Sequence, residues 1–266
     1  MSAFSAGLMA LVLTPALEAG PDRTPTPSVR DHPKETPTTA PSPPDLRGTW
    51  RFELVVVTHA RVPVLGTTMV ESRTLFRTVV SGSVQEPIID AVACQIQVEP
   101  SRAIAETTVP QPFVDAIPPK HTPAILTQTN GRWQFHADMH PQPLGYDPSV
   151  SGGTLPRAAD DPGVTDLEGD GRPGGTIHLD APLFGRIDIY VAQNAHTVLD
   201  GTWTGADEWS GQATVSAFGQ RTIGASNRLF LANADISVDQ ESSRFQWSRV
   251  PEGTTCAALR DGVGIR

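Results

Sequence analysis

The chain has 266 residues, enough for one large β domain or two small ones with an adequate hydrophobic core. Its formal net charge is −9, and lysine and arginine form no stripe along the sequence. Because binding to a phosphate backbone needs a concentrated positive surface, this composition excludes nucleic acid as an expected partner.

Residues 1–19 carry the features of a secretory signal peptide. The apolar run at 7–13 has the length of a signal-peptide core and is too short to cross a bilayer, and Ala19-Gly20 offers a cleavage point between small residues. No basic residue precedes the run, and Leu17 stands where a small residue is preferred. The segment predicts a secreted or periplasmic protein that does not span the membrane; the alternative is an apolar tail on a cytosolic protein.

Residues 20–45 follow as a predicted disordered linker. Eight prolines lie among Thr, Ser, Asp and Glu, with almost no apolar residue. Such a segment buries too little surface to offset its ordering entropy, and its prolines keep it extended. The remainder, 46–266, is expected to fold as a single β domain.

Cys94 and Cys256 are the only cysteines, and neither belongs to a Cys-x-x-Cys motif or has companions for a zinc site. In an exported protein they are expected to form a disulfide. In the chain-entropy model, closing so long a loop stabilises a fold by about 4 to 5 kcal/mol. The alternative is two free buried thiols in a reducing compartment.

Apolar residues in the folded part recur with period two far more often than with period 3.6. This alternation predicts antiparallel strands at 49–57, 68–80, 88–98, 132–136, 176–179, 185–192, 213–217, 228–236 and 244–250. Turn signals separate them at Ser81-Gly82, Asn130-Gly131, Gly152-Gly153 and Asp200-Gly201. No stretch after residue 45 predicts an amphipathic helix, so the fold class is all-β, with eight to ten strands.

The opening Gly48-Thr49-Trp50 resembles the Gly-x-Trp at the first strand of lipocalins. The resemblance implies an up-and-down antiparallel barrel in which the tryptophan closes the bottom. The same tripeptide recurs at Gly201-Thr202-Trp203, and no second lipocalin motif accompanies either copy. A β-sandwich, which fits the same strand count and turn spacing, is the alternative.

A long Pro-, Gly- and Asp-rich insertion at 141–175 ends in three alternating acidic residues, Asp166, Glu168 and Asp170, within a glycine-rich turn. Calcium takes six to eight oxygen ligands, so alternating carboxylates in a tight loop suit it. A loop this long inside a domain is usually functional or held by a ligand. The insertion therefore predicts a calcium site.

Residues 166–177 resemble the EF-hand-like calcium loops of secreted bacterial proteins. The resemblance gives Asp166, Glu168 and Asp170 loop positions one, three and five, Gly171 position six, and the backbone carbonyl of Arg172 position seven. Position twelve is Ile177 instead of a bidentate Glu, which implies weaker binding. The missing ligands are expected from Asp180 or from Asp160 and Asp161; the alternative is an acidic surface turn without an ion.

A second metal site is an alternative prediction. His136, Asp138 and His140 alternate, so on a strand all three face one way, and His178 and Asp180 repeat the pattern. If the two strands are neighbours, their side chains suit zinc or iron. Otherwise they are solvated polar positions on half-exposed strands.

Three classes of function follow from these patterns. The first, which we favour, is a secreted calcium-binding barrel that binds a small apolar ligand or an envelope component without catalysis. The second is a structural or surface-interaction protein with a solid barrel. The third is a metal-dependent enzyme using His136, Asp138 and His140. The chain has no Gly-x-Ser-x-Gly elbow and no Gly-rich phosphate loop, so an enzyme is the less favoured reading.

Overall fold

A computed structural model describes residues 42–62, 66–101, 105–205 and 207–262. The predicted signal peptide at 1–19 and most of the predicted linker at 20–45 lie outside the described residues. The described part belongs to one compact unit, Ala40–Arg266.

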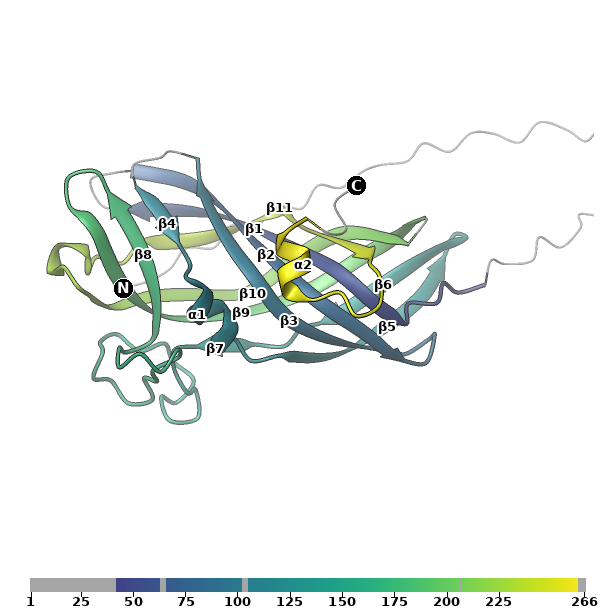
Figure 1. Ribbon diagram of the computed structural model, residues 1–266, viewed down its shortest axis with the longest axis horizontal. Helices are drawn as coiled ribbons and strands as arrows, with labels where there is room; N and C mark the ends of the chain where they lie inside the picture. The colour runs from purple at the N-terminus through teal and green to yellow at the C-terminus, as the bar shows by residue number, and fades with distance from the viewer. Residues whose placement is uncertain (1–41, 63–65, 102–104, 206, 263–266) are drawn as a thin grey trace, which may run out of the picture. The chain divides into compact units, whose positions relative to one another are not determined.

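Antiparallel strands make up most of the described part, as the period-two pattern predicts (Figure 1). In chain order they are β1 (Gly48–Val62), β2 (Gly66–Gly82), β3 (Pro87–Pro100), β4 (Glu106–Thr108), β5 (Lys120–Thr129), β6 (Arg132–Asp138), β7 (Gln142–Leu144), β8 (Gly175–Ala181), β9 (Gly185–Gly205), β10 (Glu208–Ala225) and β11 (Asp235–Arg249). The predicted all-β fold class is confirmed.

The pairing of these strands has the order of a ring. β1, β2 and β3 are consecutive neighbours, β9 pairs with β10, β10 with β11, and β11 with β1. Two different strand pairs join β3 to β9: β4 and β8 at one end of the barrel, β5 and β6 at the other. The ring therefore connects β3 to β9 by two different pairs of strands, one pair at each end of the barrel.

One predicted turn and one predicted strand are wrong. Asp200-Gly201 lies inside β9, where Gly201 faces Gly211 of β10, and a Cβ on Gly201 would come within 2.5 Å of the Phe245 ring. The glycine is there for close packing, and the hairpin reverses near Asp207, whose φ is 68°. The stretch predicted as strand 228–236 is mostly a 3-10 helix, η1 (Arg228–Phe230), and loop before β11 begins.

Two short helices went unpredicted. α1 (Gln111–Ala116) lies in the proline-dotted stretch before β5 and buries Phe113 and Val114. α2 (Cys256–Arg260) begins after Thr255, whose side chain accepts a hydrogen bond from the Ala258 N–H. Both helices are too short for a hydrophobic periodicity to reveal them.

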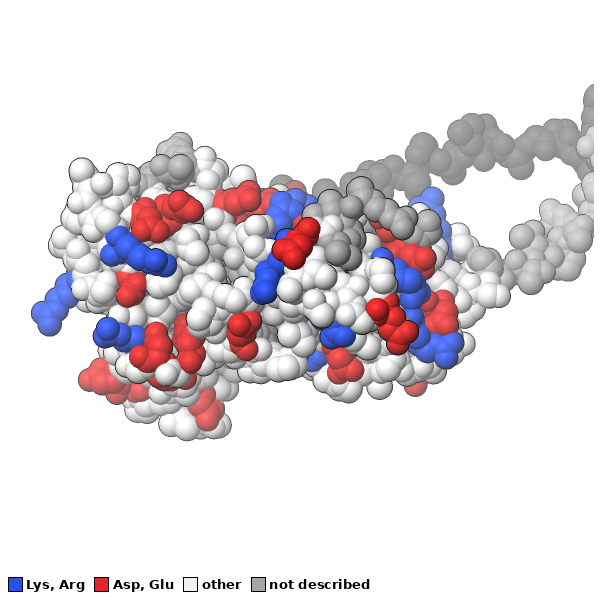
Figure 2. All heavy atoms as spheres, in the orientation of Figure 1, with Lys and Arg blue, Asp and Glu red and all other residues white. Residues whose placement is uncertain are grey.

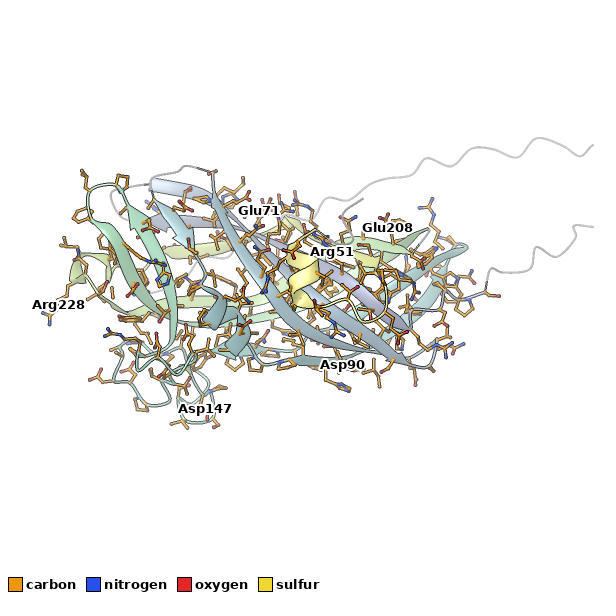
Figure 3. The ribbon with its side chains drawn as sticks, in the orientation of Figure 1. Arg51, Glu71, Asp90, Asp147, Glu208 and Arg228 are labelled. Atoms are coloured by element: carbon orange, nitrogen blue, oxygen red, sulfur yellow. A yellow bond between two sulfur atoms is a disulfide. The ribbon has the colours of Figure 1, made fainter. Side chains whose placement is uncertain are left out.

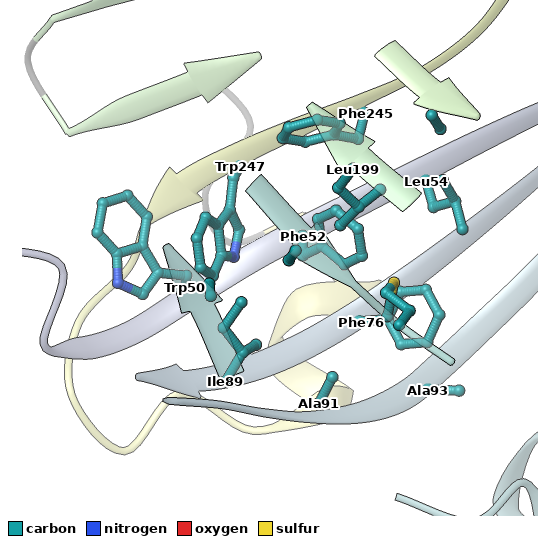
Figure 4. Packing of buried hydrophobic residues seen from close by; sticks show 14 of the residues in the cluster. Trp50, Phe52, Leu54, Phe76, Ile89, Ala91, Ala93, Leu199, Phe245 and Trp247 are labelled. Carbon is teal, nitrogen blue, oxygen red and sulfur yellow. The ribbon is translucent and has the colours of Figure 1, made fainter. Parts of the chain in front are cut away.

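Aromatic side chains fill the end of the barrel at which β1 begins (Figure 4). Trp50 and Trp247 pack with ring centroids 5.2 Å apart, and both indoles are almost fully buried. Their N–H groups donate to the Leu46 carbonyl and the Thr78 hydroxyl, each at 2.7 Å. The Arg249 guanidinium lies 4.3 Å from the centre of the Trp50 ring, so a cation covers the outermost indole.

The C-terminal segment is tied to the outside of the barrel. The sulfurs of Cys94 on β3 and Cys256 on α2 lie at bonding distance, as the sequence predicts. Leu75, Cys94, Val250 and Leu259 form a small buried cluster around this link. The disulfide therefore joins the terminal helix to a strand 162 residues earlier.

Replacing both cysteines by alanine is expected to lower the free energy of unfolding by about 2 to 5 kcal/mol, because the unfolded chain loses a long cross-link. Urea unfolding of the two proteins measures the difference. A reducing agent is expected to destabilise the wild type and leave the double variant unchanged; equal responses would contradict the pairing.

Candidate functional site

The barrel encloses a cavity of about 360 Å³ in the half away from the aromatic core. Its wall comes from every strand of the barrel that reaches this end, together with α1 and β7. Lining residues include Val56, Thr58, Ala60, Val70, Ser72, Ile96, Thr107, Phe113, Ile117, Lys120, Gln142, Leu144, Ile177, Gln193, Ala195, Phe218, Gln220 and Ile236. The barrel is thus filled in one half and hollow in the other.

The size of the inward side chains explains this division. Along β1 the inward residues become steadily smaller, in the order Trp50, Phe52, Leu54, Val56, Thr58, Ala60. In the aromatic half the remaining void is about 10 Å³, whereas the small residues beyond leave the barrel axis empty. This gradient is visible in the sequence of β1 and is the signal from which a cavity at this end could have been predicted.

Helix α1 and strand β7 cover the gap between β3 and β9. Phe113 of α1, Ile117 directly after the helix and Leu144 of β7 all line the cavity. Gly175 permits the close approach of α1, because a Cβ at that position would lie 2.3 Å from the Phe113 ring. The proline-dotted segment therefore forms part of the cavity wall.

The seam between β10 and β11 is paired at one end only. Backbone pairing ends at Gln212 and Arg244, and the Gln240 side-chain amide then bonds both the N–H and the carbonyl of Val215, at 2.9 and 2.8 Å. Beyond Gln240 the two strands share no ladder among the described residues, although both contribute to the cavity wall. This unpaired seam is a lateral boundary of the cavity.

Lys120 is the only charged residue in the cavity wall among the described residues. Its ammonium donates to the carbonyl oxygens of Met139, at 2.5 Å, and His140, at 2.9 Å. Burial lowers the pKa of Lys120 from 10.5 to about 8, and the negative charge of Asp138 opposes that shift. The cavity therefore combines an apolar wall with one partly desolvated cation.

The predicted calcium loop brings its three acidic side chains together. One oxygen each of Asp166, Glu168 and Asp170 can be chosen so that all three lie within 4.8 Å of one another. Asp166 organises the turn: its carboxylate accepts hydrogen bonds from the N–H groups of Gly169, Asp170 and Gly171, at 2.7, 3.1 and 2.7 Å. The bond from Gly171 contributes most to a lowered pKa at Asp166.

Glu168 is the least satisfied member of this cluster. Its Oε1 accepts a hydrogen bond from the Thr176 N–H at 2.6 Å, whereas its Oε2 is buried and has no hydrogen-bond partner among the described residues. Burial, followed by the charges of Asp170 and Asp166, raises the pKa of Glu168. An unpaired buried carboxylate oxygen beside two other carboxylates is an arrangement that a cation would stabilise.

The other predicted carboxylate ligands, Asp160, Asp161 and Asp180, are not part of this cluster. Asp180 lies near the other end of β8, four residues and thus about 13 Å of strand beyond Thr176. Asp161 accepts hydrogen bonds from the N–H groups of Arg157 and Ala158, and Asp160 is exposed. The guanidinium of Arg172 lies 5.8 Å from the centre of the Tyr190 ring.

The long insertion also has an apolar anchor of its own. Its residues Tyr146, Leu155 and Val164 pack against Tyr190 and Ile223 on the outer face of β9 and β10. The insertion projects from the barrel beside β8, with Asp147 at its surface (Figure 3). The insertion therefore has apolar packing of its own that contributes to its order.

The histidine pattern does not assemble a second metal cluster in the described part of the chain. β6 and β8 pair with different stretches of β9: His136 is opposite Asp200, and His178 is opposite Asp188. Twelve residues of strand separate these positions by about 40 Å. Each histidine pairs locally with an aspartate instead: His136 with Asp200, His178 with Asp188, and His140 and His196 with Asp138.

Comparisons with protein-family models, curated protein sequences and solved structures give no match to this chain.

Figure 2 shows acidic and basic side chains interspersed over the visible face of the barrel. No described helix is long and apolar enough to cross a bilayer.

The lowered pKa of Lys120 predicts a pH-dependent stability difference from Lys120→Met. Between about pH 8 and 10.5 the folded wild type has released this proton while the unfolded chain retains it, so its stability rises with pH relative to the variant. The slope is at most about 1.4 kcal/mol per pH unit. Urea unfolding of both proteins at pH 7 and pH 10 tests this; a difference independent of pH would contradict it.

Proposed function

We propose that this chain is a secreted, calcium-binding β-barrel protein that holds a small apolar molecule in the hollow half of the barrel, without catalysis. The cavity of about 360 Å³ is the observation that carries the proposal. Its volume falls in the range of small-molecule sites, and its wall combines apolar side chains with a few polar groups, as such sites do.

The cavity favours ligand binding over a purely structural role. Protein interiors are close-packed, and an unfilled apolar void reduces stability because its lining loses contacts. A barrel selected only for rigidity would continue the aromatic packing of Trp50 and Phe52 along its axis. The small inward residues Thr58, Ala60 and Ala195 instead keep space free.

The cavity wall also favours binding over acid–base catalysis. Its described residues include no histidine and no carboxylate. His136, Asp138 and His140 lie on exposed or half-exposed positions and are engaged in local His–Asp contacts. General acid–base chemistry needs titratable groups that face the bound molecule, and Lys120 is the only such side chain in the described part of the wall.

The proposed calcium ion would lie between Asp166, Glu168 and Asp170. The proximity of the three carboxylates and the unsatisfied Glu168 oxygen support this placement. With few protein ligands and no bidentate Glu at position twelve, the affinity is expected to be that of extracellular modules, with a dissociation constant of about 10⁻⁴ to 10⁻³ M.

Export to an oxidising compartment is the third part of the proposal. The Cys94–Cys256 pair at bonding distance supports it, because stable disulfides are rare in reducing compartments. A millimolar calcium affinity fits the same extracellular or periplasmic setting, since cytosolic sensors bind the ion far more tightly.

Filling the cavity is expected to abolish uptake of an apolar probe. N-phenylnaphthylamine, an uncharged fluorophore, should brighten on binding the wild type. Ala195→Phe places a ring in the cavity and should weaken binding roughly tenfold or more.

The matched control is Ala217→Phe, the same substitution at an exposed position of β10 outside the cavity wall. It is expected to leave the affinity unchanged. Equal losses in both variants, or no fluorescence change with the wild type, would contradict binding in the barrel.

Calcium is expected to raise the melting temperature of the metal-free protein. At a concentration of 10 to 100 times Kd, calcium should add about 1.4 to 2.7 kcal/mol to the free energy of unfolding. For a domain of this size, each kcal/mol raises the melting temperature by roughly 2–4 °C. Asp170→Asn and Glu168→Gln should remove the increase, whereas Asp160→Asn, which removes a charge elsewhere in the insertion, should retain it.

Without calcium, Glu168→Gln is expected to melt at the same temperature as the wild type or higher at pH 7. The raised pKa of Glu168 stabilises the fold only while the group is protonated, and this contribution is lost as pH rises through the folded-state pKa. A calcium-dependent increase that persists in Glu168→Gln would place the ion elsewhere.

A further inference from the structure

Lys120 lies where the filled half of the barrel meets the hollow half. It is the first residue of β5 and belongs to the wall of the cavity. One of its two hydrogen-bond acceptors is the carbonyl of Met139, a residue whose side chain borders both the cavity and the small void of the aromatic half. The ammonium is therefore anchored at the inner end of the cavity.

The ammonium retains unused binding capacity. A lysine head group has three N–H donors, and the carbonyls of Met139 and His140 accept two of them. Among the described residues no other acceptor bonds the third donor, and no carboxylate forms an ion pair with Lys120. Asp138, the acidic group whose charge acts on Lys120, is bonded to His196 and to the His140 N–H.

The described part of the cavity wall offers no charge that compensates the Lys120 ammonium. The other polar residues of the cavity wall are uncharged glutamine, threonine and serine side chains, and the remainder is apolar. Lys120 is half-buried, and partial removal of its charge from water is unfavourable unless an opposite charge compensates it. The protein supplies no such charge within the described part of the wall.

We propose that Lys120 binds the anionic head of the cavity's ligand, so that the natural ligand is an amphipathic carboxylate with its apolar body along the hollow half of the barrel. This inference rests on the proposed binding function and adds the ligand class to it. A single cation with one free N–H suits a singly charged carboxylate better than a phosphate, which would require further donors. Gln142, whose side-chain amide donates to the Pro118 carbonyl at 3.3 Å, is another polar residue of the wall.

The apolar tail then points away from the aromatic core. The wall beyond Lys120 is lined by Val56, Val70, Ile96 and Ile236, among others. A ligand in this orientation buries its chain against apolar side chains and compensates the lysine charge at the same time. The reverse orientation would leave the lysine charge uncompensated.

Competition between laurate and methyl laurate tests the proposal, because the two differ in the charge of the head group and share the same chain. Each would displace N-phenylnaphthylamine from the full-length protein. A charge-assisted hydrogen bond corresponds to roughly tenfold or more in affinity, so the wild type should bind laurate at least about tenfold more tightly than methyl laurate.

Lys120→Met should lose this preference and keep the wild-type affinity for methyl laurate and for the fluorophore. The retained affinities would show that the cavity of the variant is intact. Lys120→Arg, which retains the charge, should keep a preference for laurate. Equal affinities of the wild type for both compounds would overturn the inference, as would a preference that survives in Lys120→Met.

The two proposals fail in different ways. If the fluorophore binds and laurate is not preferred, the assignment of Lys120 is wrong and the cavity remains a neutral apolar site. If neither the fluorophore nor laurate binds the wild type, the binding function itself is wrong, and the inference falls with it.

Discussion

The backbone pairing of β9 holds the rest of the structure together. This strand of 21 residues pairs with β10 along one edge and with β8, β7 and β6 in succession along the other. Among the described strands β7 is paired with β9 alone, whereas β8 and β6 link β9 to β4 and β5, so the ring closes because β9 joins both routes back to β3. The cavity is the space that this arrangement encloses.

Side-chain volume then divides the barrel into two parts. The long strands β1, β2, β3, β9 and β10 extend through both halves, and among the described residues only the β10–β11 seam loses its pairing in the hollow half, so strand length alone does not explain why one half is solid. Large aromatic residues meet on the axis near Trp50 and Trp247, whereas small and β-branched residues occupy equivalent inward positions farther along. The filled half supplies packing energy, and the hollow half gives up part of that energy to create a binding space.

Local features of the fold could be predicted from the sequence. Asn130-Gly131 forms the hairpin turn between β5 and β6 with φ of 52° and 76°, because asparagine and glycine tolerate left-handed geometry. The misleading turn signal at Gly201 arose because glycine also allows close packing, here beneath Phe245. The same residue type has two physical uses, and only the neighbouring strands distinguish them.

The sequence predicts the features that depend on neighbours along the chain: the period-two strands, and the acidic cluster of Asp166, Glu168 and Asp170, whose members lie within five consecutive residues. It also indicated the cysteine pair, since only two cysteines exist. The tertiary structure alone decided the two routes between β3 and β9, the separation of the histidine strands, and the position of Lys120 in the cavity wall. These depend on pairings between residues far apart in the chain, for which local periodicity carries no information.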